Sequence, residues 1–222
     1  QLFSQGVADL DWSPDNNKIT AVGDNGGGIN MKTFTYDTGN SLGEMIGHNK
    51  RVLTCAYRPT RPFKIMTGSE DMKTAFFAGP PFKLDHTNNI HTNFVNCVRY
   101  SPDGSIIASA GSDKKIQFYD GISGEPTHLI DNAHAGTIYS LAFNSDGTKF
   151  VSVSADKTAK LWDVATYTNE KTYTFTSSLI ETVSQVSDMQ VSCTYCKSYN
   201  GGKFITLSLN GNINVLGDGA SS

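Results

Sequence analysis

The sequence has few of the features that mark membrane proteins, nucleic-acid-binding proteins and secreted proteins. No run of 18 apolar residues occurs, so we expect no transmembrane helix. The first residues, QLFSQGVADL, lack the basic segment and long apolar run of a signal peptide. The 21 Asp and Glu residues slightly exceed the 18 Lys and Arg residues, which does not favour a nucleic-acid surface. We therefore expect a cytoplasmic protein that binds neither nucleic acid nor membranes.

Only four cysteines occur, and their spacing does not indicate a metal or redox site. Cys55 and Cys97 lie in similar sequence contexts, which favours buried free thiols. Cys193 and Cys196 form a CxxC motif, which can be half of a zinc site or a redox pair. However, zinc needs four ligands, and no second CxxC or histidine pair is present. A redox pair favours a helix N-terminus, whereas VSCTYCKSY is typical of an extended strand. The sequence therefore predicts no metal and no cofactor.

Three short strands separated by tight turns are indicated in the segment GTIYSLAFNSDGTKFVSVSADKTAKLWD at 136–163. Aromatic and β-branched residues predict strands at 137–143, 149–154 and 158–163. Asn, Asp and Gly between the strands suit tight turns. With His134 in front and Trp162-Asp163 at the end, this layout is typical of one blade of a β-propeller.

Four kinds of residue repeat along the chain with one period, close to the roughly 40–45 residues of a four-stranded blade. Histidines are 43 and 43 residues apart, and turn aspartates 42 and 43. Aromatic residues that end the third strands are 41, 42 and 43 apart, and those that end the first strands 45, 43 and 43. The markers are His48, His91 and His134; Asp71, Asp113 and Asp156; Tyr36, Phe77, Tyr119 and Trp162; and Trp12, Tyr57, Tyr100 and Phe143. The sequence therefore predicts an all-β propeller with repeats at 1–46, 47–90, 91–132, 133–175 and, least regular, 176–217.

The recurring polar residues predict a hydrogen-bond network inside each blade rather than a catalytic or metal site. Histidines that occur once per blade are spread around a ring and cannot gather in one site. In the fourth repeat, Asp156 can accept from His134, and Ser152 can bridge His134 to the indole N–H of Trp162. The matching residues are His91, Ser109 and Asp113 in the third repeat and His48, Thr67 and Asp71 in the second. No GxSxG, HExxH or paired-carboxylate motif occurs, so we expect no enzyme.

Four segments carry a closer resemblance to known proteins: DTGNSLGEMIGHNK at 37–50, RPFKIMTGSEDMKTAFFAGPPFK at 61–83, FVNCVRYSPDGS at 94–105 and SADKTAKLWDVAT at 154–166. The repeats resemble those of the WD-repeat family. Within it, the four segments resemble the actin-interacting protein 1 family, for which GPPF at 79–82 is distinctive. The resemblance extends over roughly residues 6–217. It implies two seven-bladed propellers in tandem, of which this chain would cover about five blades of the N-terminal propeller.

The same resemblance implies a binding function in the actin cytoskeleton and no enzymatic activity. Members of this family bind actin filaments decorated with cofilin, promote filament disassembly and restrict growth at the barbed end. Their filament contacts include an acidic residue before a repeat aspartate, a Lys-aromatic pair after GPPF and an aromatic residue at the next repeat. The matching positions here carry Glu70, Lys83 with Leu84, and Phe94. Leu84 departs from the usual aromatic residue, and in the short loop 24–28 only Asp24 can supply a further acidic contact.

Each of these assignments has a structural alternative. Phe94 can be a core residue at a strand start, and Glu70 and Lys83 can be ordinary solvated charges. For the whole chain, the alternative is a generic WD-repeat scaffold in another complex, which explains the repeats but not the segment GPPFK. Two prolines place 79–82 at a blade edge or in a loop, because proline cannot donate to a strand ladder. We therefore expect Phe82 and Leu84 to be partly exposed.

Overall fold

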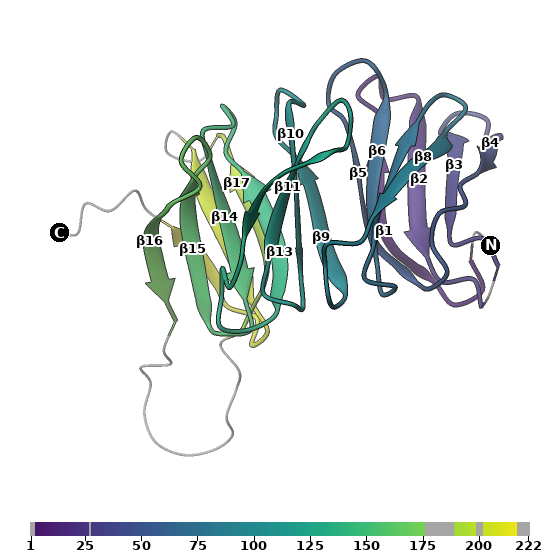
Figure 1. Ribbon diagram of the computed structural model, residues 1–222. Coiled ribbons are helices and arrows are strands. Elements are labelled where there is room, and N and C mark those ends of the chain that lie inside the picture. Colours follow the sequence, from purple (N-terminus) through teal and green to yellow (C-terminus); the bar gives the residue numbers. More distant parts are fainter. Residues whose placement is uncertain (1–2, 27, 176–188, 199–201, 217–222) are drawn as a thin grey trace.

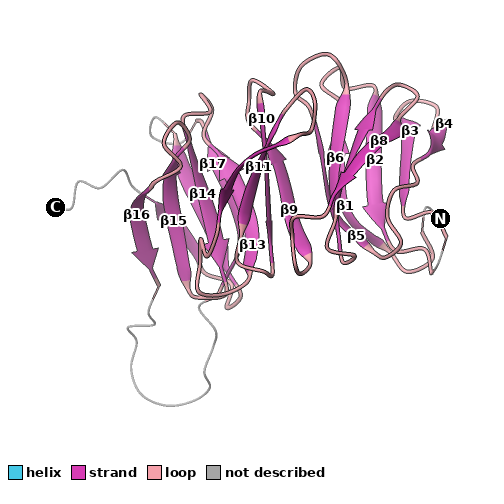
Figure 2. Cartoon of the chain, viewed as in Figure 1, coloured by secondary structure: helices cyan, strands magenta, loops and turns pink. Residues whose placement is uncertain are grey.

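The computed structural model describes residues 3–26, 28–175, 189–198 and 202–216, which form strands and loops. The strands make five antiparallel sheets that stand next to one another in chain order (Figures 1 and 2). None of the described segments is a helix, so none provides a helix long and apolar enough to cross a membrane. The all-β architecture of repeated four-stranded sheets confirms the predicted fold class.

Each sheet is one blade, and its strands follow one another in space as they do in the sequence. The first two blades contain β1 (Val7–Trp12), β2 (Lys18–Gly23), β3 (Met31–Thr35) and β4 (Ser41–Glu44), then β5 (Val52–Tyr57), β6 (Lys64–Ser69), β7 (Thr74–Ala78) and β8 (Lys83–Asn88). The third and fourth contain β9 (Val95–Tyr100), β10 (Ile106–Gly111), β11 (Ile116–Asp120) and β12 (Pro126–Ile130), then β13 (Ile138–Phe143), β14 (Lys149–Ser154), β15 (Thr158–Asp163) and β16 (Asn169–Thr174). The fifth has three strands, β17 (Gln190–Cys196), β18 (Lys203–Ser208) and β19 (Ile213–Leu216), and residues 176–188 of the predicted fifth repeat lie outside the described residues.

The apolar core lies between neighbouring blades. One cluster joins Val22 and Met31 of the first blade to Val52 and Phe77 of the second. Further clusters join the second blade to the third, the third to the fourth, and the fourth to the fifth. Because both faces of a blade are covered, the central strands β6, β10 and β14 are buried on both sides for nearly their whole length. Continuous burial explains why these strands read as unbroken apolar and small residues rather than as an alternating pattern.

The first strands of the blades contact one another in order, from β1 through β5, β9 and β13 to β17. On each first strand, the N–H groups that point away from the second strand have no strand partner and need another acceptor. Asp9 Oδ2 accepts the N–H of Cys55 at 3.2 Å, and Asp11 Oδ2 accepts the N–H of Tyr57 at 2.8 Å. Two carboxylates of the first blade therefore pair with the free strand edge of the second.

The turn Gly79–Phe82 connects β7 to the outer strand β8, so its prolines avoid the inner ladder as expected. The expectation that Phe82 is partly exposed is wrong, since only 6% of its surface is accessible. The turn directs the ring into the core between the first two blades, where it meets Tyr57 edge-on with centroids 5.6 Å apart. Leu84, two residues further along β8, is 43% exposed.

Candidate functional site

In the fourth blade a buried chain of hydrogen bonds runs from a carboxylate to an indole. Asp156 Oδ2 lies 2.9 Å from His134 Nδ1, and Ser152 Oγ lies 2.6 Å from His134 Nε2. The indole N–H of Trp162 donates to the same Ser152 Oγ at 2.8 Å. A neutral imidazole with its proton on Nδ1 satisfies every member, because Ser152 then donates to Nε2 and accepts from Trp162. A complete network of this kind is stabilising, whereas a partly satisfied one is costly.

The third blade keeps this arrangement with a tyrosine in place of the indole. His91 lies 2.9 Å from Asp113 and 2.7 Å from Ser109 Oγ. Ser109 Oγ also lies 3.1 Å from the hydroxyl of Tyr119, which accepts from Thr74 Oγ1 of the second blade at 3.3 Å. Tyrosine therefore extends the chain of hydrogen bonds across the blade junction.

In the second blade the aromatic residue at the matching position, Phe77, has no donor. His48 Nδ1 lies 3.0 Å from Asp71, and Nε2 lies 2.8 Å from Thr67 Oγ1. The Thr67 hydroxyl has a single hydrogen, and the carbonyl of Ala75 lies 3.3 Å away as a second acceptor for it. The hydroxyl thus remains paired within its own blade.

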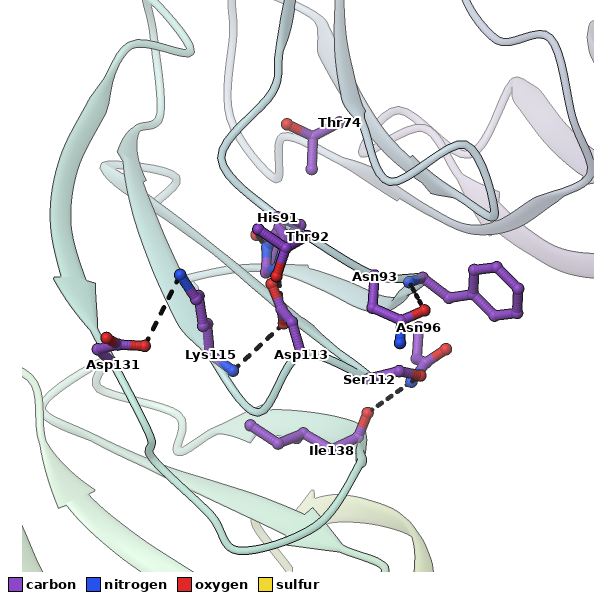
Figure 3. A network of polar contacts seen from close by, with 12 residues as sticks. Thr74, His91, Thr92, Asn93, Asn96, Ser112, Asp113, Lys115, Asp131 and Ile138 are labelled. Atoms are coloured by element: carbon purple, nitrogen blue, oxygen red, sulfur yellow. Dashed lines mark hydrogen bonds and ion pairs between the residues drawn. The ribbon is translucent and has the colours of Figure 1, made fainter.

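These aspartates also fasten the connection between blades to the turn after the second strand. Asp113 Oδ2 accepts the N–H of Thr92 at 3.0 Å, and the other blades repeat this bond from Asn49 to Asp71 and from Ala135 to Asp156. Figure 3 shows His91, Thr92 and Asp113 of the third blade with their neighbours, including the ion pair from Lys115 to Asp131 at 3.7 Å. The network therefore marks one end of the second, third and fourth blades. We call this the histidine end: the end with His48, His91, His134 and the turns that follow β2, β6, β10 and β14.

Burial and hydrogen-bond partners shift the pKa values of the network aspartates in opposite directions. Burial alone would raise the pKa of Asp156, but hydrogen bonds from His134 Nδ1, from Thr158 and from the backbone of Ala135 together hold that pKa well below its usual range. The pKa values of Asp71 and Asp113 are lowered through the corresponding histidines in the same way. The ionised carboxylates are thus favoured in the folded protein.

One backbone hydrogen bond repeats at the histidine end of every blade. The first residue after the second strand donates its N–H to the carbonyl of the residue immediately before the first strand. The pairs are Asp24 to Gly6, Glu70 to Arg51, Ser112 to Phe94, Ala155 to Thr137 and Leu209 to Met189, with donor–acceptor distances from 2.8 to 3.2 Å. Asp24 and Glu70 therefore occupy the same position in successive blades, and Phe94 stands at the partner position of the third blade.

The structure brings three of the candidate contact residues to this one end. Phe94 is 41% exposed and is not a core residue. Glu70 is half-buried, and its carboxylate forms no ion pair with any described residue. Asp24 instead accepts the N–H of Gly26 at 2.9 Å, which ties it to its own turn.

Lys83 and Leu84 lie elsewhere, at the beginning of the outer strand β8. Lys83 pairs with Ala78, the last residue of β7, and Leu84 pairs with Phe77. Ala78 is four residues from Thr74 at the histidine end, which is roughly 13 Å along an antiparallel strand. Both side chains are exposed, but they belong to the outer edge of the second blade rather than to the surface that carries Glu70 and Phe94.

The sequence patterns miss an apolar residue at the histidine end. Met72 follows Asp71 in the turn after β6, has a left-handed backbone with φ of 69°, and is 40% exposed. The next two blades have Lys114 and Lys157 at this position, also with positive φ. Aligning the repeats by their turn aspartates would have identified this apolar exception beside Glu70.

The CxxC residues do not form a site. Both lie on β17, and three positions along a strand place side chains on opposite faces. The thiol of Cys193 lies 3.7 Å from the carbonyl of Val151, and burial raises its pKa to about 12. Across the described part of the chain, no three His, Cys, Asp or Glu side chains are grouped so that they could hold a metal ion.

Replacing Ser152 tests the network directly. Ser152→Ala leaves the Trp162 indole N–H and His134 Nε2 without their shared partner in a buried place. We expect the free energy of unfolding, measured by urea denaturation, to fall by about 1–3 kcal/mol. The control Ser145→Ala, at an exposed turn, should change it by less than about 0.5 kcal/mol. Equal stability of the two variants would contradict the network.

The depressed pKa of Asp156 predicts a dependence of stability on pH. A carboxyl with a lower pKa in the folded state contributes stability above its unfolded pKa, near 3.8, and loses that contribution as the pH falls towards the folded pKa. The free energy of unfolding of the wild type should therefore fall more steeply below about pH 4 than that of Asp156→Asn. The variant should already be less stable than the wild type at pH 7. Urea denaturation from pH 7 to pH 3 measures both slopes, and parallel curves would show that Asp156 has no such role.

Comparison with known proteins agrees with this architecture. Residues 82–120 and 124–163 each match the family model described as WD domain, G-beta repeat. The chain is 43% identical over 211 residues to actin-interacting protein 1 of Drosophila melanogaster, which is 95% of this chain and 33% of that protein. It is 41% identical over 218 residues to WD repeat-containing protein 1 of Xenopus tropicalis, which is 97% of this chain and 34% of that protein.

The chicken WD repeat-containing protein 1 (Gallus gallus) is similar at 39% identity over 218 residues, 97% of this chain and 34% of its own length. The chain thus spans about a third of the length of the curated relatives that it matches. These similarities confirm the resemblance that the four quoted segments carry. Together with the repeated blades, the two matching stretches show that the chain contains WD repeats and is similar to WD repeat-containing proteins over nearly its whole length.

Proposed function

We propose that this chain is an actin-regulatory binding module that acts on filaments carrying cofilin and promotes their disassembly and barbed-end restriction. The observation that carries the proposal is the similarity, over nearly the whole chain, to a protein named for its interaction with actin. The proposal includes association with the actin cytoskeleton and a binding rather than catalytic role. It also takes the five blades as part of an N-terminal propeller.

The histidine end offers the surface for this contact. Glu70 presents a carboxylate without an ion-pair partner among the described residues, and Phe94 and Met72 add exposed apolar area. The repeated backbone bonds and the buried aspartates hold these positions on rigid turns, so binding them costs little ordering entropy. Lys83 and Leu84 lie on the outer edge of the second blade, where they would contact a filament only if it extends around that edge.

A rigid surface can drive disassembly by differential affinity. If the histidine end fits the filament geometry produced by cofilin better than that of the bare filament, binding shifts the filament population towards the altered form. The shift is limited by the ratio of the two affinities. This mechanism requires no chemistry from the module.

Reversing the charge of Glu70 tests the surface. Glu70→Lys should weaken co-sedimentation with cofilin-decorated filaments by roughly tenfold, because it places a like charge where a complementary one is proposed. The matched control Glu125→Lys makes the same change in an exposed turn at the other end of the third blade. If both variants pellet with filaments as the wild type does, Glu70 is an ordinary solvated charge.

Replacing Phe94 shows whether this residue contacts the filament or packs in the core. Phe94→Ala should weaken filament binding several-fold while the free energy of unfolding changes by no more than about 1 kcal/mol, because the ring is 41% exposed. Parallel co-sedimentation and urea denaturation measure the two effects. A loss of stability of about 3 kcal/mol or more with unchanged affinity would identify Phe94 as a core residue.

A further inference from the structure

A hollow with a volume of about 700 Å³ opens between the first and second blades, at the end opposite the histidines. Three turns meet there: the β1–β2 turn, the β5–β6 turn and the β7–β8 turn. Its lining residues are Asp15, Lys18, Arg61, Pro62, Phe63, Gly79 and Pro80. We call it the proline hollow. Its size is in the range of roughly 300–1,000 Å³ that ligand sites occupy.

Arg61 is the one cation of this lining whose charge is left unpaired by the described residues. Its guanidinium carbon lies 4.7 Å from the centroid of the buried Phe63 ring. The Arg61 side chain forms no ion pair and no hydrogen bond within the described part of the chain. Lys18 also lies over this ring, at 5.0 Å, but its ammonium is 3.0 Å from Asp15 Oδ2.

Contact with an aromatic ring holds a guanidinium in place without using its N–H donors. The free donors form a planar fork that matches a carboxylate with two parallel hydrogen bonds. The charges of Asp15, Lys18 and Arg61 sum to one positive charge, so one carboxylate neutralises the hollow. A phosphate dianion would leave an excess negative charge beside Asp15.

We propose that the proline hollow binds an acidic peptide segment of a protein partner. A Glu or Asp side chain of the segment pairs with Arg61, and the rest of the segment lies against the apolar walls of Pro62, Phe63 and Pro80. The hollow is lined by turns at the opposite end from Glu70 and Phe94. The turn Gly79–Phe82 leads directly into Lys83 and Leu84 at the start of β8, so the inference is independent only of the filament contact through Glu70 and Phe94.

Calorimetric titration of the chain with capped hexaglutamate at low ionic strength tests the proposal. Hexaglutamate should bind and hexaglutamine should not, because only the former carries carboxylates. Arg61→Ala should weaken binding on the order of tenfold, because it removes a charged hydrogen-bond donor. Arg61→Lys should weaken binding less, since it keeps the charge but loses the fork. The control Arg51→Ala removes the same charge from an exposed position at the histidine end and should leave the affinity unchanged.

Four results would overturn the proposal. The first is a failure of hexaglutamate to bind the wild type, and the second is binding to Arg61→Ala with the affinity of the wild type. An equal loss for Arg51→Ala would show general charge attraction in place of a site. Displacement of the peptide by an equal concentration of inorganic phosphate would show a simple anion site. A thermal melt checks folding of Arg61→Ala, and Arg61→Lys provides the second variant if the melt shifts.

Discussion

The structure depends on each blade covering a face of the next. The central strands are buried on both sides, and every core cluster contains residues of two adjacent blades. Such packing leaves few places for polar groups, so those that occur inside must be paired. The histidine side chains of three blades are almost fully buried, and each is held between a carboxylate and a hydroxyl. The buried networks therefore serve the packing and also fix the turns at one end of the blades.

The two ends of the blades differ in consequence. At the histidine end, aspartates bind the connections between blades, and the turns have the same backbone bond in each repeat. Differences between blades are then confined to side chains, as where Met72 replaces the lysines of later blades. At the opposite end, the β7–β8 turn and two neighbouring turns enclose the proline hollow instead. A rigid repeat thus supports two surfaces of different chemistry.

Much of this fold can be predicted from the sequence, because the markers repeat with one period. In the fourth blade, β13, β14 and β15 begin and end within about one residue of the predicted strands at 137–143, 149–154 and 158–163. Complementary donors and acceptors point to the contacts of Ser152 with His134 and Trp162, which the structure has at 2.6 and 2.8 Å. The outer strands such as β4 and β12 could not be placed, because mostly exposed edge strands have no apolar alternation to reveal them.

The arrangement of the candidate contacts could not be predicted in the same way. The burial of Phe82 depends on how the proline turn directs it towards Tyr57, which spacing does not reveal. The separation of Lys83 from Glu70 depends on the register of β8 against β7. The proline hollow arises where turns distant in sequence converge, and Arg61 carries no local signal of it.

Co-sedimentation of the wild-type protein with actin filaments, in the presence and absence of cofilin, tests the central functional claim most directly. The account predicts that the protein pellets with filaments, or that filaments are lost, when cofilin is present and to a much smaller extent when it is absent. Equal behaviour with and without cofilin would contradict a preference for the altered filament. The repeats would then be explained by a scaffold role in another complex.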